Sequence, residues 1–167
     1  MMRGIGAPRM LMPYNQVIAA AGPVYTPKTY SPINPILDPG FESGGFNAGW
    51  VKGANPNCLR IDGTNPHSGA FGLVASFTCD TDFSQPNVNL TGYSNLTFWV
   101  KSQYGTSDCF YRVYMGSTFI QQFADPVDTA WHQIVVPMGT HLTGTLDISM
   151  FFVSLGDVLY FDDFGVS

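Results

Sequence analysis

Apolar and polar side chains alternate along much of the chain beyond Phe41. A period of two places successive side chains on opposite faces of an extended strand, so each alternating segment predicts a strand with one face against a core. Clusters rich in Gly, Asn, Asp and Ser, such as DGTNPHSG and QYGTSD, separate these segments and are typical of turns. The alternating segments are residues 96–101, 110–115, 132–137, 146–153 and 158–166.

This pattern predicts an all-β fold, an antiparallel jelly-roll β-sandwich from about Phe41 to Ser167, preceded by an extended N-terminal arm. The composition agrees, because Glu occurs once against eleven Asp, and Gly and Pro are frequent. Such a chain is poor in residues that favour helices. We therefore expect under about a tenth of the residues to be helical.

Charge divides the chain into two parts. Residues 1–33 carry Arg3, Arg9 and Lys28 and no acid, whereas residues 34–167 hold four bases against twelve acids, a net charge of −8. A basic arm on an acidic body is suited to reaching an acidic surface. Three dispersed bases neutralise too few phosphates for firm binding to nucleic acid, and no apolar run approaches the roughly 20 residues of a membrane span. We expect neither nucleic acid nor a membrane as partner.

The domain boundary is therefore placed between residues 33 and 34. Five prolines between residues 23 and 39 favour an extended, polyproline-like course. Prolines and polar residues interrupt the apolar core that a secretory signal needs. Two interpretations stay open: a linker or strap folded on its own domain, or a docking arm held by another protein. In the second, the anchoring residues are Arg3, Arg9, Met10, Leu11 and Tyr14.

Cysteines leave the redox environment open. Cys58, Cys79 and Cys109 show no spacing typical of a metal site. They are either three buried thiols or, if the protein is exported, include one disulfide.

Several short motifs occur in an order known from one family of sugar-binding domains. They are NPILDPGFESGGFNAGW, HSGAFGLVA, LTGYSNLTFWVK, WHQIVVP and LYFDDFGVS. Over residues 34–167 this order resembles the jelly-roll carbohydrate-binding modules of the four-and-nine type, which open with an Asn-Gly-x-Phe-Glu turn and soon reach a Trp. The triplet Asp38-Pro39-Gly40 departs from the commoner form of that turn. The motifs are short, so the resemblance implies the fold more than the function.

The same resemblance implies a structural calcium ion that ties the first strand to the last. The matching carboxylates are Glu42 and Asp162. Calcium takes six to eight oxygen ligands, many of them backbone carbonyls, so two carboxylates can recruit it. The alternative is that Glu42 caps a turn and Asp162 accepts backbone N–H groups.

The sequence does not predict an enzyme. The three histidines are scattered and form neither a zinc spacing nor part of a nucleophile motif. Asp162 and Asp163 are neighbours on an expected strand, so their side chains should point to opposite faces. Asp80 and Asp82 could share a face, but the interpretation that we favour is a solvated turn.

Aromatic residues on the outward positions suggest a binding surface. Trp99 and Lys101 face outward from one expected strand, and Arg112 and Tyr114 face outward from the next. Flat aromatic faces stack on sugars while polar neighbours bind hydroxyl groups, and the same cluster would serve as a subunit interface. We expect these four residues to form one carbohydrate or interface platform, with Trp131 in the core.

Two functions fit these observations. The first is a structural accessory protein: a decoration or cement protein at the virion surface of a phage, homo-oligomeric, with its arm on the major capsid protein and with glycan adhesion as a further role. The arm and the charge division favour it. The alternative is the carbohydrate-binding module of a secreted, extracellular polysaccharide-active system, which accounts for the expected fold and for Trp99.

Overall fold

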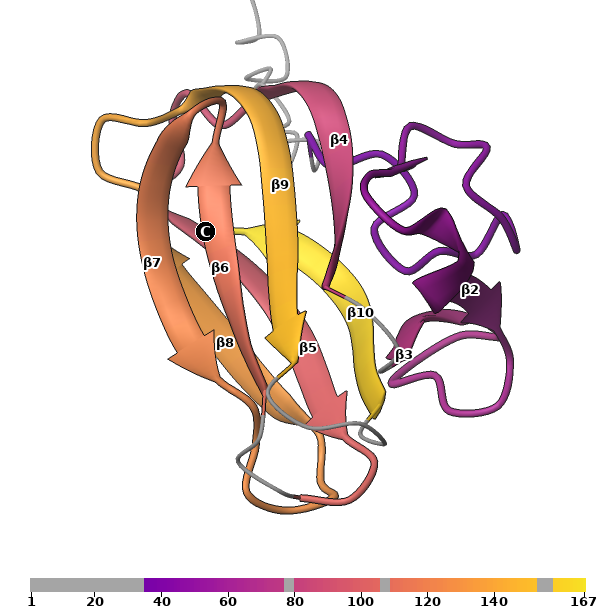
Figure 1. Ribbon diagram of the computed structural model, residues 1–167. Coiled ribbons are helices and arrows are strands. Elements are labelled where there is room, and N and C mark those ends of the chain that lie inside the picture. Colours follow the sequence, from indigo (N-terminus) through magenta and orange to yellow (C-terminus); the bar gives the residue numbers. More distant parts are fainter. Residues whose placement is uncertain (1–34, 77–79, 106–108, 153–157) are drawn as a thin grey trace, which may run out of the picture. The chain divides into compact units, whose positions relative to one another are not determined.

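The computed structural model describes residues 35–76, 80–105, 109–152 and 158–167. Among these residues, ten strands form two antiparallel five-stranded sheets that pack as a sandwich (Figure 1). Sheet A has the order β1-β4-β9-β6-β7, and sheet B has the order β2-β3-β10-β5-β8. The strands are β1 (Val51–Lys52), β2 (Leu59–Asp62), β3 (Gly72–Ser76), β4 (Thr81–Asn89), β5 (Asn95–Ser102), β6 (Cys109–Met115), β7 (Thr118–Ala124), β8 (His132–Pro137), β9 (Thr143–Phe152) and β10 (Val158–Val166).

The predicted all-β sandwich is confirmed. The five alternating segments appear as β5, β6, β8, β9 and β10. In the described part of the chain, the helical structure is limited to a short 3-10 turn, Pro56–Cys58. The arm and its anchoring residues, together with the rest of residues 1–34, lie outside the described residues. Within the described residues, no helix has the length and apolar character needed to cross a membrane.

The core lies between the sheets and is built by the alternation. Leu96, Phe98 and Val100 of β5 have no exposed surface, and Tyr111 and Val113 of β6 are equally buried. Each large apolar side chain that leaves water contributes about 1.5–3 kcal/mol. The predicted inward faces of these two strands are therefore confirmed, and their intervening residues face out of the sandwich.

Trp50 fixes the segment that precedes β1. Its ring lies 5.3 Å from that of Phe41 and 4.9 Å from that of Phe164, between centroids. Its indole Nε1–H donates to the carbonyl of Asp38 at 3.0 Å. A buried indole usually finds such a partner. These contacts hold the turn that carries Glu42 against the core.

Two expectations from the sequence change here. Trp131 is half-buried and lies against His67, 5.4 Å between ring centroids, so its placement in the core is wrong. Cys58 is disulfide-bonded and Cys109 is a buried thiol outside any disulfide, so the interpretation as three buried thiols is wrong and the disulfide alternative holds. Hydrophobic character alone did not distinguish a core tryptophan from one that packs under a loop.

Candidate functional site

The four residues expected to form one platform lie on two different sheets. Trp99 and Lys101 belong to β5 of sheet B, whereas Arg112 and Tyr114 belong to β6 of sheet A. All four alternate with fully or nearly buried residues and therefore face outward. Since the inner faces of the sheets pack together, their outer faces point in opposite directions. The structure does not bring the two pairs together.

On sheet B, the outward side chains hold a loop. The loop between β2 and β3, residues 63–71, places the His67 ring parallel to Trp99, with centroids 4.0 Å apart and planes 15° apart. Lys101 donates from Nζ to Asn65 Oδ1 at 2.9 Å. Trp99 is half-buried beneath this loop. The side chains of this face thus satisfy one another.

Two neighbouring aspartates of β10 bind the same loop. Asp162 Oδ2 accepts the backbone N–H groups of His67 at 2.7 Å and Ser68 at 3.2 Å. Asp163 Oδ2 pairs with His67 Nδ1 at 2.6 Å, and Asp163 Oδ1 accepts the Ser68 hydroxyl at 2.8 Å. The expectation that the aspartates face opposite ways is wrong, because β10 is irregular after Asp162 and Asp163 has a positive φ of 48°.

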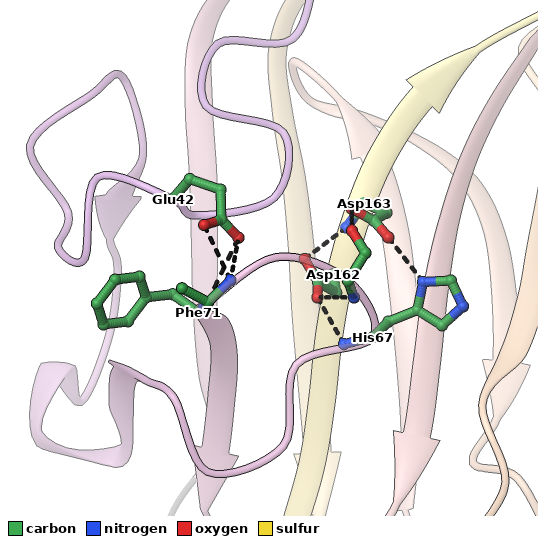
Figure 2. A network of polar contacts seen from close by, with 7 residues as sticks. Glu42, His67, Phe71, Asp162 and Asp163 are labelled. Carbon is green, nitrogen blue, oxygen red and sulfur yellow. Dashed lines mark hydrogen bonds and ion pairs between the residues drawn. The ribbon is translucent and has the colours of Figure 1, made fainter.

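Glu42 binds the other end of this loop. Its carboxylate accepts the N–H of Ala70 at 3.1 and 3.0 Å and that of Phe71 at 3.4 Å. Gly69 passes so close that an added Cβ would lie 2.0 Å from Glu42 Oε1. Figure 2 shows the loop held at two places, near Phe71 by Glu42 and near His67 by the aspartates. We call this set of contacts the loop latch.

The loop latch is the place where the resemblance implies calcium. Asp162 is fully buried, and burial raises its pKa to about 6 although three backbone N–H groups favour the carboxylate. Every carboxylate oxygen of Glu42, Asp162 and Asp163 already faces a hydrogen-bond donor. In the described residues, no group of three or more His, Cys, Asp or Glu is placed to hold a metal. In this arrangement the carboxylates act as hydrogen-bond acceptors, the alternative named above; a calcium ion at this place stays a prediction of the resemblance.

The outer face of sheet A is arranged differently. The strand register aligns four polar residues across β4, β9, β6 and β7, and neighbouring strands lie about 4.8 Å apart. This polar row consists of Asp82, Ser149, Arg112 and Gln122. Within it, Arg112 donates from Nε to Gln122 Oε1 at 2.9 Å. A rigid sheet thus presents a line of hydrogen-bonding groups to one side.

A second row runs beside the first and is displaced from it by two residues along β4, β9 and β6. It consists of Ser84, Asp147, Tyr114 and Phe119. The Tyr114 and Phe119 rings meet edge to face at 5.7 Å, and Phe119 is 52% exposed. On the other side of the polar row, Phe110 stacks on Phe151 at 5.3 Å. We give the name aromatic row to the second row, which consists of Ser84, Asp147, Tyr114 and Phe119.

A hollow opens at one end of the polar row. It measures about 160 Å³ and lies between β4, β9 and the segment after β1. The residues that line it are Ala54, Asp80, Thr81, Asp82, Ser149, Met150 and Phe151. Asp82 is fixed in the wall of the hollow, because its Oδ1 accepts the N–H of Ala54 at 2.7 Å. Asp80 binds the N–H of Phe152 at 3.1 Å, so these two acids are not the simple solvated turn expected.

An acid pair connects the two rows. Burial raises the pKa of Asp147 above its ordinary value; the Ser149 hydroxyl, which donates to it at 2.6 Å, opposes this, and the neighbouring Asp82 carboxyl raises the pKa further. The charge repulsion follows from the register, which makes the two acids diagonal neighbours on β4 and β9. Sequence reasoning missed this pair.

No family model matches the chain, and no curated protein matches its sequence. Solved structures do match. A family 61 carbohydrate-binding module in complex with β-1,4-galactotriose has a TM-score of 0.60 and 20% identity, over 80% of this chain and 97% of that one. The K3 adhesin domain of Lys-gingipain from Porphyromonas gingivalis has 0.63 and 18%, over 79% and 97%. A family 16 carbohydrate-binding module has 0.57 and 15%, over 80% and 99%.

The protein has a carbohydrate-binding-module fold. The fold-level resemblance stated from the sequence motifs is thereby confirmed. At these identities the likeness concerns the carbohydrate-binding-module fold alone, because one fold can carry many unrelated functions.

Proposed function

We propose that the protein is a carbohydrate-binding module without catalytic activity of its own, and that it binds a glycan on the outer face of sheet A. One observation carries this proposal: a polar row and an aromatic row lie side by side across four strands, next to an open hollow. The named neighbours, which are binding modules and an adhesin domain, support a non-catalytic role.

The two rows supply the two contacts that a sugar needs. A pyranose ring stacks on an aromatic face, and its hydroxyls bind polar groups at fixed positions. Phe119 and Tyr114 offer exposed or half-buried rings, and Gln122, Ser149 and Asp82 offer donors and acceptors. Residues on strands hold their geometry better than residues on loops. Sheet B offers less, because Trp99 and Lys101 are engaged by the loop.

A secreted or extracellular location belongs to the same proposal. The disulfide of Cys58 supports it, because disulfides persist mainly in oxidising compartments. One structural neighbour is named for binding a sugar polymer: a xylan-binding domain from Paenibacillus barcinonensis, with a TM-score of 0.53 at 13% identity.

The comparisons favour this carbohydrate-binding alternative over the virion decoration hypothesis. That hypothesis depends on residues 1–33, outside the described residues, and it stays a prediction together with the capsid partner and the homo-oligomer. Deleting residues 2–33 tests it. A decoration protein would lose its assembly and keep its fold, whereas a carbohydrate-binding module would keep its glycan affinity.

Calorimetric titration with β-1,4-galactotriose, cellotetraose and xylotetraose tests the proposed function. Tyr114→Ala and Phe119→Ala should each weaken binding about 5- to 150-fold, the 1–3 kcal/mol of a stacking contact. Tyr104→Ala is the matched control, because Tyr104 is a 57% exposed aromatic outside this face. The proposal would be rejected if Tyr114→Ala and Phe119→Ala bound glycans as tightly as the Tyr104→Ala control. It would also be rejected if the protein bound no glycan on a broad array.

A further inference from the structure

Resting on the proposed function, we propose that Asp82 and Asp147 make the site selective for uncharged glycans, by accepting hydroxyl groups from a neutral sugar and repelling sulfated or uronic ones. The two residues would determine specificity at the same site where the aromatic row provides stacking.

The positions of the Asp82 and Asp147 carboxyl groups support this selectivity. Asp82 pairs with Ser149, and Asp147 pairs with Ser84, so the carboxyl groups sit diagonally on adjacent strands, one in each row. A sugar that spans both rows would meet both carboxyl groups. Asp82 also lines the hollow.

Local contacts fix both carboxyl groups in place. Asp82 Oδ1 accepts the Ala54 N–H at 2.7 Å, and the chain at Gly53 runs so close that a Cβ there would lie 1.6 Å from Asp82 Oδ2. Asp147 Oδ1 accepts the Ser149 hydroxyl at 2.6 Å. A carboxylate has about four acceptor positions, so each group keeps capacity for a ligand hydroxyl. Hydrogen bonds to an ionised acceptor are roughly twice as strong as neutral ones.

The charge of the face is the second support. Asp80, Asp82 and Asp147 gather at or beside the hollow, and Arg112 is the base in the polar row. Arg112 is engaged by Gln122 and by the Phe151 ring, 4.5 Å from its centroid. None of the ion pairs among the described residues joins Arg112 to these acids. An anionic ligand therefore meets a net negative site.

The pH dependence follows from the groups that face Asp147. Burial, with Asp82 nearby, raises the pKa of Asp147, while Ser149 opposes the shift. Its proton is therefore taken up at a higher pH than for an ordinary aspartate. Sulfate esters keep their charge over this range, so acidification changes the protein and not the ligand. Selectivity against a sulfated sugar should shrink as the pH falls.

Titration calorimetry with matched ligands tests the proposal on the full chain. The probes are cellotetraose and β-1,4-galactotriose, each beside its 6-O-sulfated form. We expect the neutral form to bind at least about tenfold more tightly at pH 7, the size of one unscreened charge contact. Asp82→Asn and Asp147→Asn should weaken the neutral ligand and narrow the ratio, while Asp128→Asn, an acid of the β7–β8 connection, should change neither.

A second test uses the wild-type protein and needs no variant. Lowering the pH or adding salt should move the affinity ratio toward one. Equal or tighter binding of the sulfated form at pH 7 overturns the selectivity and leaves the proposed function standing. A ratio that is unchanged in both Asn variants and across pH also overturns it. Binding of neither form, together with no binding of any glycan on a broad array, rejects the proposed function itself, and the selectivity with it.

Discussion

The two outer faces of the sandwich differ in how their polar and aromatic groups are used. On sheet B, the 63–71 loop is contacted by Trp99, Lys101 and Asp162, so these side chains interact with other parts of the protein. On sheet A, the polar and aromatic rows contact mainly one another and the solvent side. An outward-facing tryptophan is thus no evidence of a binding site until its contacts are known.

The largest expected effect concerns the loop latch. Asp162→Ala leaves three backbone N–H groups without their acceptor, at about 1–3 kcal/mol for each group that stays buried. We expect the free energy of unfolding to fall by about 3 kcal/mol or more, measured by urea denaturation. Asp128→Ala, with a 56% exposed side chain, should change it by under about 0.5 kcal/mol. A latch variant as stable as the control would contradict the division between the faces.

A reciprocal pair of variants sharpens the comparison. Trp99→Ala should lower the free energy of unfolding by about 2–4 kcal/mol, because a half-buried ring loses its stack on His67, and should leave glycan affinity unchanged. Phe119→Ala should do the reverse, with a stability loss under about 1 kcal/mol and a clear loss of affinity. Melting and titration of the same two proteins suffice, and the opposite pattern would move the binding face to sheet B.

Acidification should affect the latch moderately. The folded pKa of Asp162, about 6, lies above the ordinary 3.8, so the folded state binds the extra proton and stability rises as the pH falls from about 6 toward 4. The gain from this group is on the order of 1–2 kcal/mol, since one pKa unit is about 1.4 kcal/mol. Carboxyl ¹³C titration by NMR should give Asp162 an apparent pKa near 6. A value at or below that of ordinary aspartates would contradict it.

Removal of divalent cations should have the smallest effect. Because the latch carboxylates are occupied by N–H and hydroxyl donors, excess chelator should leave the melting temperature within about 1 °C. A drop of several degrees that added calcium reverses would restore the cation implied by the sequence resemblance.

Alternation predicted the strands whose inward positions are uniformly apolar. It failed for β4 and β7, where Pro86 and polar positions interrupt the first and a register shift opposite Val113 and Tyr114 disturbs the second. These two strands carry Asp82, Gln122 and Phe119, so the alternation pattern could not predict half of the candidate site.

The prediction of a single platform formed by Trp99, Lys101, Arg112 and Tyr114 was wrong for a related reason. Alternation gives the face of a strand but not its sheet, and β5 and β6 are consecutive in sequence yet belong to opposite sheets. The acid pair joins residues 82 and 147, and only the β4–β9 register makes them neighbours. For this acid pair, the local signal in the sequence was an outward Asp147 between buried Leu146 and Ile148.

The position of β10 has a consequence for how the protein is made. This strand enters sheet B between β3 and β5, and its Asp162 bonds to His67 across 95 positions of sequence. Contacts so distant form slowly, because a long loop must close first. On the ribosome, β3 and β5 therefore wait with unpaired edges until residues 158–166 emerge, an interval in which aggregation competes with folding.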